Sequence, residues 1–515
     1  MNLTSKHKQI WLMAVFLPFA AAYFMNLGQE VSSQERELRG VWMATVLNID
    51  YPSRPTPQAA TLQAEMRAQL RRLKRLGFNA VFLQVRPAAD ALYQSDIVPW
   101  SKWLSGQQGV APSSGFDPLA FAVDEAHQLG MELHAWLNPY RAAMSLDTLD
   151  LAGNHVFYQH PDWVVAYGDR RYLDPGIPAV QDHLLDVVDE LVTKYPIDGI
   201  HFDDYFYPYP VIGQEFPDSV TYVRYGSQFA DRGDWRRDNV NRLVARLHER
   251  IKQADPTIQF GISPFGIWRN QQDDPRGSLT RTQATSYDDL YGDALAWAES
   301  GTVDYLAPQL YWSIGYEAAD YAHLLDWWTE NTPENTRLLI GQAAYKVGNN
   351  HDTRWDNLEE LPRQVNRNRA SQRVSGSIYF SARSILQNEV GLDQRLSDMY
   401  AQPSLLPERS LTNRLRTTPP KPKVEKLKDS DRGPMVVWSV DKKLSKEELP
   451  LYYGIYRRPT GGNSWQLIDT TPFGQGCWRF HYYDESADPE ETYEYQVRAI
   501  DKWHVSSHDE DEDLP

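Results

Sequence analysis

Short apolar runs alternate with amphipathic segments through most of the first 400 residues. The amphipathic segments have helical spacing: within 180–195, Leu184, Val187, Val188 and Leu191 fall on one face, and acidic residues turn the other way. The apolar runs are short and rich in strand-forming residues, and there are eight of them: 39–46, 79–86, 131–139, 198–205, 259–266, 304–312, 337–345 and 376–382.

Strands that are apolar on both faces and alternate with helices predict a parallel sheet covered by helices. Eight repeats over about 350 residues predict an α/β fold, a (β/α)8 TIM barrel, over residues 36–400. A doubly wound open sheet is the alternative. It is less favoured, because no glycine-rich phosphate loop follows the first run.

The pattern changes after residue 400. Residues 401–424 are proline-rich and predict a stiff linker. Residues 425–502 then alternate apolar and polar positions without a helical stretch, which predicts a small all-β, immunoglobulin-like sandwich. This segment resembles a fibronectin type III domain in its early Trp438 and its late tyrosine-rich strand. Residues 503–515 predict an acidic, solvated tail. One face of the late strand carries Tyr493, Tyr495, Val497 and Ala499.

The N-terminus has the layout of a secretory signal peptide. Residues 1–22 combine a basic start at Lys6 and Lys8, an apolar stretch and three final alanines. We therefore expect an exported protein, in the periplasm or cell envelope, whose mature chain begins near Tyr23. An uncleaved anchor helix is the alternative, because apolar residues continue to Leu27.

Composition narrows the class of partner. The chain is 42% hydrophobic, enough for a large core, and its single cysteine, Cys477, forms no internal disulfide. A net charge of −17 argues against nucleic acid, since phosphate binding needs a basic patch. The 17 tryptophans and 29 tyrosines give mild support to a carbohydrate, because flat rings stack on sugar faces.

Two adjacent carboxylates, Asp203 and Asp204, end the fourth apolar run. Active sites of TIM barrels form at such strand ends. Neighbouring carboxylates push their proton affinities apart, so one keeps its proton near neutral pH. Glycoside hydrolysis needs such an acid and a second group at the anomeric carbon. We therefore predict Asp203 and Asp204 as catalytic residues; a carboxylate that caps the following loop is the alternative.

Other predicted strand ends carry polar and aromatic residues that we expect to bind substrate. No cofactor or metal is expected: a metal-dependent deacetylase is disfavoured because no His-x-x-x-His pair occurs at a strand end. For His134 and His201 the alternative role is packing in the core. For Trp268 and Trp312 the alternative is that they cover the rim of the barrel. The substrate-binding candidates are Arg86, His134, Asn138, Tyr140, His201, Tyr205, Tyr207, Trp268, Gln309, Tyr311 and Trp312.

Five motifs occur in the order RGVWMATVLNIDYPS, FLQVRPAADALYQSDIVPWS, HAWLNPYR, DGIHFDDYFYPYP and APQLYWSIG. Together they resemble the bacterial glycosyl-hydrolase-like 10 family, exported TIM-barrel proteins often followed by a fibronectin type III domain. The family includes a divisome-localised glycosidase that cleaves peptidoglycan strands stripped of stem peptides. The resemblance implies a cell-wall glycan substrate, rich in N-acetylated sugars, and cell-division or envelope proteins as partners. A non-catalytic glycan-binding protein is the alternative.

The fourth run also resembles the chitinase signature, with Asp198 and Asp203 in register with two of its acids. His201 and Tyr205 replace the other two, so the usual chitinase mechanism is disfavoured. An N-acetylated sugar offers a variant in which its own acetamido group attacks. We expect Asp204 to protonate the leaving oxygen and Asp203 to orient the acetamido group; the reverse assignment is the alternative.

Overall fold

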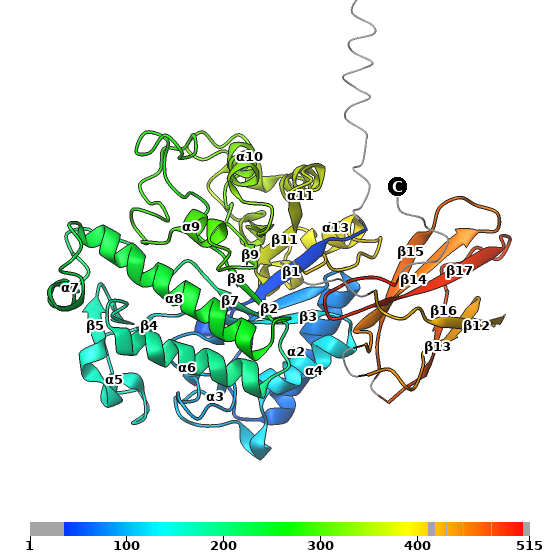
Figure 1. Cartoon of the computed structure of the whole chain (residues 1–515), viewed down its shortest axis with the longest axis horizontal. Coiled ribbons are helices and arrows are strands. Elements are labelled where there is room, and N and C mark those ends of the chain that lie inside the picture. The colour runs from blue at the N-terminus through cyan, green and yellow to red at the C-terminus, as the bar shows by residue number, and fades with distance from the viewer. Residues whose placement is uncertain (1–34, 410–417, 429, 446–447, 475, 508–515) are drawn as a thin grey trace, which may run out of the picture.

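The computed structural model describes residues 35–409, 418–428, 430–445, 448–474 and 476–507. Eight parallel strands close into a barrel in the order β1-β11-β10-β9-β8-β7-β3-β2 (Figure 1). This confirms the predicted (β/α)8 barrel, and each predicted apolar run contributes one strand. The barrel strands are β1 (Leu38–Met43), β2 (Ala80–Arg86), β3 (Glu132–Leu137), β7 (Gly199–Phe202), β8 (Gln259–Ile262), β9 (Tyr305–Leu306), β10 (Arg337–Gln342) and β11 (Val374–Phe380).

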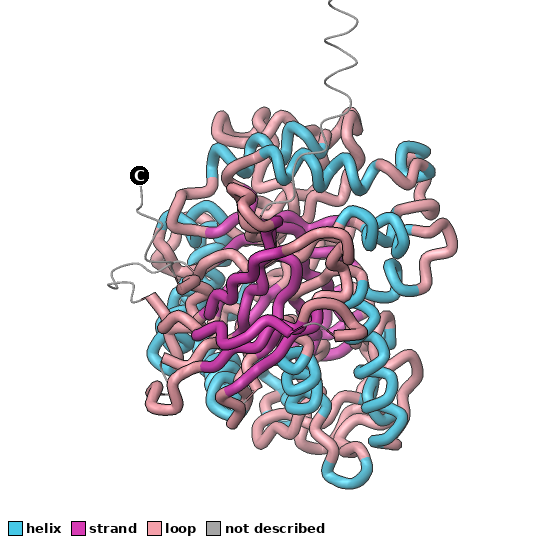
Figure 2. Tube along the Cα trace, turned by 90° about the vertical axis from the view of Figure 1, so that its right-hand side faces the viewer, coloured by secondary structure: helices cyan, strands magenta, loops and turns pink. Residues whose placement is uncertain are grey.

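Helices surround the strands, as Figure 2 shows with strands in magenta and helices in cyan. In α6, Leu184, Val187, Val188 and Leu191 are buried against the barrel, as their spacing predicts. The helices are α2 (Ala59–Arg75), α3 (Lys102–Ser105), α4 (Pro118–Gln128), α5 (Val156–Gln159), α6 (Pro178–Lys194), α7 (Ser219–Tyr225), α8 (Arg232–Ala254), α9 (Ala294–Glu299), α10 (Tyr321–Asn331), α11 (Glu360–Ala370), α12 (Ala382–Leu386) and α13 (Leu392–Met399).

A three-stranded antiparallel sheet interrupts the connection between β3 and α6. Its strands are β4 (Arg141–Ala143), β5 (Val164–Tyr167) and β6 (Arg170–Leu173), in the order β4-β6-β5. Because β4 begins only four residues after β3 ends at Leu137, this sheet fixes the chain at the barrel mouth and brings Arg141 there.

The C-terminal part is a small all-β domain, as predicted. Its two antiparallel sheets have the orders β12-β13-β16 and β15-β14-β17, and Trp438 is fully buried between them. The fibronectin type III assignment stays a prediction. The strands are β12 (Lys423–Lys428), β13 (Met435–Ser439), β14 (Tyr452–Pro459), β15 (Gln466–Pro472), β16 (Arg479–Tyr483) and β17 (Tyr493–Ile500).

The start of the predicted acidic tail belongs to this domain. Residues 503–507 return along β17, with Ser506 bridged to Ile500 and His504 buried. Residues 508–515, the predicted signal peptide 1–22 and residues 410–417 of the predicted linker lie outside the described residues. Within the described part, no helix is both long and apolar enough to cross a membrane.

The small domain packs against the end of the barrel where the strands begin. Figure 1 shows it, in orange and red, beside β2, β3, α2 and α4. Arg36, just before β1, donates hydrogen bonds to the carbonyl of His504 and the hydroxyl of Ser506, both at 2.9 Å. Apolar residues of the barrel interior and of the small domain form one cluster, which includes Leu38 and Tyr452. The described part of the small domain does not cover the opposite end, where the strands finish (Figure 1).

Candidate active site

Asp203 and Asp204 directly follow β7 and lie at the open end of the barrel. Only 4% of each residue is exposed, yet both border a cavity of about 320 Å³. Three further predicted residues, Tyr205, Gln309 and Tyr311, border the same cavity. The structure therefore brings the two predicted catalytic residues and part of the predicted binding set together at the carboxyl ends of the strands.

Asp203 is placed to hold a proton near neutral pH. Trp136 Nε1 and Asn138 Nδ2 each donate to its Oδ2 at 3.1 Å. Burial, reinforced by the charge of Asp204, raises the pKa of Asp203 to about 7, against the opposing effect of Arg141 and the two hydrogen bonds. Its Oδ1 has only longer contacts, at 3.3 Å from Asn138 Nδ2 and 3.4 Å from the Tyr205 amide, so this oxygen is the better place for a proton.

Asp204 has a different set of donors. Tyr209 donates its hydroxyl to Oδ2, and Gln309 Nε2 donates to Oδ1 at 3.0 Å. Gln309 is itself fixed by a hydrogen bond to the Ser263 carbonyl at 3.0 Å. Burial raises the pKa of Asp204 above its ordinary value, and these two hydrogen bonds and the charge of Arg141 offset only part of that rise. One strong donor on each oxygen favours the ionised carboxylate, so the pair is arranged for a protonated Asp203 beside a charged Asp204.

Aromatic side chains form much of the cavity wall. Trp42, Trp136, Tyr345 and Phe380 border it, together with Arg141, whose guanidinium lies 4.9 Å from the Tyr205 ring centre. Flat apolar walls around two acids suit a sugar ring, whose C–H faces pack on aromatic rings. Trp42, Tyr345 and Phe380 were not predicted. Each lies at or just after the end of β1, β10 or β11, so position at a strand end was the available signal.

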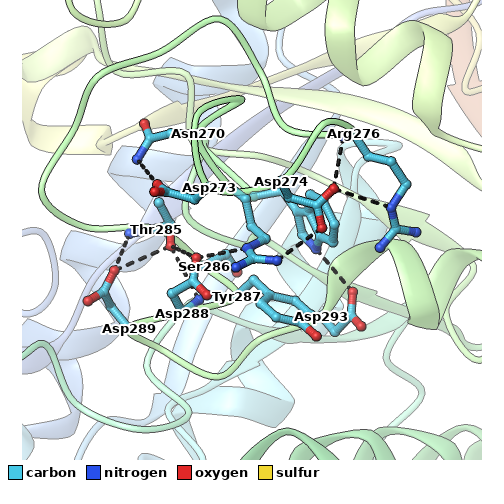
Figure 3. A network of polar contacts seen from close by, with 12 residues as sticks. Asn270, Asp273, Asp274, Arg276, Thr285, Ser286, Tyr287, Asp288, Asp289 and Asp293 are labelled. Carbon is cyan, nitrogen blue, oxygen red and sulfur yellow. Dashed lines mark hydrogen bonds and ion pairs between the residues drawn. The ribbon is translucent and has the colours of Figure 1, made fainter. Parts of the chain in front are cut away.

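Trp268 does not reach the cavity, contrary to the prediction. It is 1% exposed, and its Nε1 donates to Asp293 Oδ1 at 3.0 Å. The loop between β8 and α9 folds around it through a polar network of aspartates and Thr285, shown in Figure 3. Arg269 joins this network through Asp274 at 3.0 Å and Asp288 at 2.9 Å. Trp268 therefore stabilises the loop instead of contacting substrate.

Arg86, Tyr140 and Tyr207 are also buried away from the cavity. Tyr140 and Tyr207 pack in the layer between strands and helices. Arg86 Nη1 donates to the Asn138 and Pro139 carbonyls at 2.7 and 3.0 Å. Arg86 thus supports Asn138, which in turn supports Asp203. The predicted direct contacts of these three residues and of the fully buried Asn138 with substrate are replaced by packing and positioning roles.

Comparison with known proteins agrees with this geometry. Residues 37–357 match the family described as Glycosyl hydrolase-like 10. The chain belongs to this family. It is 43% identical over 480 residues to glycosyl hydrolase YngK of Bacillus subtilis, covering 92% of this chain and 93% of that protein. It is 44% identical over 365 residues to glycosyl hydrolase DigH of Escherichia coli K12, covering 67% and 82%.

The solved structures that resemble the chain are less similar to it in sequence. The PgaB (BpsB) glycoside hydrolase domain from Bordetella bronchiseptica is 13% identical with a TM-score of 0.45, covering 71% of this chain and 99% of that domain. Membership of the family makes the chain a glycoside hydrolase, as predicted. Within the described residues, no group of three or more histidine, cysteine, aspartate or glutamate side chains is arranged to hold a metal ion.

The two predicted histidines lie inside this glycoside hydrolase's barrel, below the cavity. The Tyr305 hydroxyl joins them, 3.1 Å from His134 Nδ1 and 3.0 Å from His201 Nδ1. Trp42 Nε1 is 3.0 Å from His201 Nε2 and can only donate, so His201 Nε2 accepts and Nδ1 carries the proton. Burial lowers the pKa of His201 well below its usual value, which agrees with a neutral ring.

The direction of the remaining hydrogen bonds follows from this tautomer. The Tyr305 oxygen accepts from His201, so its hydroxyl donates to His134 Nδ1, and His134 Nε2 donates to Glu132 at 3.2 Å. We call Glu132, His134, Tyr305, His201 and Trp42 the polar column. His134 therefore faces the barrel interior and does not border the cavity, which favours the alternative of core packing over the predicted contact with substrate. His201 reaches the cavity only through Trp42 and Ser263, whose Oγ lies 3.2 Å from Nε2.

The lower end of the polar column meets the small domain. Arg409 Nη2 forms an ion pair with Glu132 Oε1, and His504 Nε2 lies 3.2 Å from the same oxygen. Burial opposes ionisation of Glu132, but the charges of Arg409 and His504 hold its pKa well below the usual range. Asp198, at the start of β7, accepts from the Leu133 amide at 2.8 Å and pairs with Arg409 at 3.3 Å. It is therefore structural.

Proposed function

We propose that the protein hydrolyses glycosidic bonds in bacterial cell-wall glycan, in strands of N-acetylated sugars that lack stem peptides. The observation that carries the proposal is the buried carboxyl pair on an aromatic-walled cavity, with the pKa of Asp203 raised to about 7. Such an acid holds a proton at neutral pH and still releases it readily. The family relatives support glycoside hydrolysis in general, and the cell-wall substrate is our extension of it.

The reaction begins with proton transfer from Asp203 to the glycosidic oxygen as the bond from that oxygen to the anomeric carbon breaks. The acetamido oxygen of the same sugar forms the new bond to the anomeric carbon. Asp204, ionised and held by Tyr209 and Gln309, accepts a hydrogen bond from the acetamido N–H and balances the positive charge of the cyclic intermediate. Water then attacks the anomeric carbon, the bond from that carbon to the acetamido oxygen breaks, and the ionised Asp203 takes a proton from the attacking water. These roles reverse the assignment expected from sequence.

Digestion of purified glycan tests this function. The full chain is incubated with peptidoglycan stripped of stem peptides, with intact peptidoglycan and with chitin oligosaccharides, and products are analysed by mass spectrometry. We expect oligosaccharide products from stripped strands and none with Asp203→Asn. Strands that are bound but never cut would contradict the proposal and favour a non-catalytic glycan-binding protein.

We further propose export to the periplasm or cell envelope, where cell-division or envelope proteins are available as partners. The basic, apolar and small-residue segments of residues 1–22 support this. N-terminal sequencing of the protein recovered from fractionated cells should find a chain that begins near Tyr23. Recovery of the protein in the cytoplasm with Met1 intact would contradict export.

A further inference from the structure

A second hollow lies beside the catalytic cavity at the same end of the barrel. Two consecutive pairs of residues divide the two spaces: Tyr311 and Tyr345 border the catalytic cavity, and their successors Trp312 and Lys346 border the second hollow. The wall between them is thus one residue thick. The second hollow, which we call the side groove, measures about 570 Å³ and is bordered by Trp312, Tyr316, Lys346, His351, Arg354 and Trp355.

The ammonium of Lys346 borders the side groove and can still bind an anion there. It donates one hydrogen bond, to the Tyr311 carbonyl, and has three N–H groups. No carboxylate of the described residues forms an ion pair with it within 4.0 Å. Nζ lies 5.8 Å from the ring centre of Tyr345 and 6.0 Å from that of Trp355. A half-buried ammonium between two rings has lost part of its hydration, so an anionic ligand would be stabilised there.

The other charges of the side groove are largely balanced. Arg354 Nη1 pairs with Asp352 Oδ1 at 3.0 Å, and Asp352 Oδ2 accepts from the Ser313 hydroxyl. With Arg354 and Asp352 offsetting each other, Lys346 leaves a net charge of about +1 when His351 is neutral. That charge matches a single carboxylate better than a doubly charged phosphate. It stands out in a chain whose net charge is −17.

Exposed aromatic rings complete the features of a sugar subsite. Tyr345, on the boundary between the two spaces, is 38% exposed, and Tyr316 is 37% exposed. Trp312 is partly buried and packs edge-on against Phe265, with ring centres 5.6 Å apart. A glycan that occupies the catalytic cavity therefore meets stacking surfaces and a positive charge one step further along its length.

We propose that the side groove is a subsite for a sugar unit that bears one carboxylate, and that Lys346 determines this specificity. The inference rests on the proposed function, because the same strand must place a neighbouring bond in the catalytic cavity. Lys346 Nζ donates its free hydrogens to the carboxylate, and the sugar rings pack on Tyr345 and Tyr316. A glycan without carboxylates fills the groove but gives the ammonium no anionic partner.

The test compares one glycan in charged and neutral forms. Stripped peptidoglycan fragments are used as they are, or after their sugar carboxylates have been converted to primary amides with carbodiimide and ammonia. For the wild-type chain, amidation should raise KM about 10-fold, the effect of one charge-assisted hydrogen bond, with kcat nearly unchanged. Lys346→Met should raise KM about 10-fold for the charged form only, so that the preference disappears.

Controls separate this effect from loss of folding or a general change of charge. Lys442→Met removes an exposed lysine of the small domain and should leave both KM values unchanged. Arg354→Gln should weaken binding of the charged form by only about 3-fold, because Asp352 already shares its charge. Near-UV circular dichroism checks that each variant is folded. If Lys346→Met fails to fold, a wild-type chain that binds charged and amidated strands equally still overturns the proposal.

A binding measurement keeps the two proposals distinguishable. Calorimetric titration of the full-length Asp203→Asn variant with both glycan forms, with and without Lys346→Met, needs no catalysis. If the wild-type chain does not cleave the strands, but the Asp203→Asn variant still binds the charged form more tightly and loses this preference with Lys346→Met, the proposed hydrolysis is rejected and the subsite is kept. Equal affinity of the Asp203→Asn variant for both forms would reject the subsite. Equal binding of strands that carry stem peptides, whose sugar carboxylates are amides, would also overturn it.

Discussion

Replacement of Asp203 by asparagine should make the protein more stable at alkaline pH while it removes activity. Burial and the charge of Asp204 raise the pKa of Asp203 from 3.8 to about 7. Below pH 3.8 the carboxyl is protonated in both the folded and the unfolded state, so its burial does not lower the free energy of unfolding. Between these two pKa values the unfolded chain releases the proton first, and stability falls with rising pH. Above pH 7 the cost reaches about 4 kcal/mol, at about 1.4 kcal/mol per pH unit.

Asparagine keeps the acceptor for Trp136 and Asn138, but it adds an N–H2 group without an evident acceptor. The buried, unsatisfied N–H2 group reduces the gain in the free energy of unfolding by about 1 kcal/mol. We therefore expect Asp203→Asn to raise the free energy of unfolding by about 2–3 kcal/mol at pH 8 and to lower it slightly at pH 4. Urea titration at both pH values measures this, with the exposed Asp186→Asn on α6 as control. A variant that is equally stabilised at both pH values, or destabilised at pH 8, would refute the reasoning.

Other predictions concern the same machinery. Asp203→Asn and Asp204→Asn should each lower kcat by about 10²–10⁴-fold; an aryl glycoside whose leaving group needs no proton should rescue only Asp203→Asn, and rescue of Asp204→Asn instead would reverse the roles. The rate should fall as pH rises through about 7, where Asp203 loses its proton. Tyr209→Phe removes a donor that lowers the pKa of Asp204, so the acidic limb of the pH–rate profile should move to higher pH; an unmoved limb would contradict the role of Asp204 as the ionised partner. Glu132→Gln removes the shorter of the two ion pairs of the buried Arg409 and leaves it only the longer pair with Asp198, so it should destabilise the fold by about 3–5 kcal/mol in urea titration. The exposed Glu330→Gln should have no effect.

The barrel and its catalytic pair were predictable because both depend on local pattern. Eight apolar runs between amphipathic helices leave few alternatives to a closed parallel barrel, and carboxylates directly after a run fall at its mouth. Alternation along a strand also predicts which side chains point inward. Alternation does not show how far along the barrel axis an inward side chain lies. His134 and Trp136 share the inward face of β3, but Trp136 lies two residues, about 7 Å, nearer the mouth. That difference separates a cavity wall from the barrel interior.

Residues beyond the strand ends were harder to place for another reason. Tyr140, Tyr207 and Trp268 follow strands, but the loops that carry them turn back into the packing between strands and helices. Their direction depends on partners far away in sequence, such as Asp293 for Trp268. Trp42 and Phe380 were missed because a wall of a sugar site needs no polar group. A search for chemistry alone passes over them.

The position of residue 35 and of the small domain has a consequence for how the enzyme would be tethered. Residues 35–37 pair with Leu405 beneath the barrel, and the small domain docks on that same side. Any attachment made through the chain before residue 35, or through the small domain, therefore holds the molecule from behind. The cavity then points away from the point of attachment, and a long strand can approach the mouth without passing around the tether.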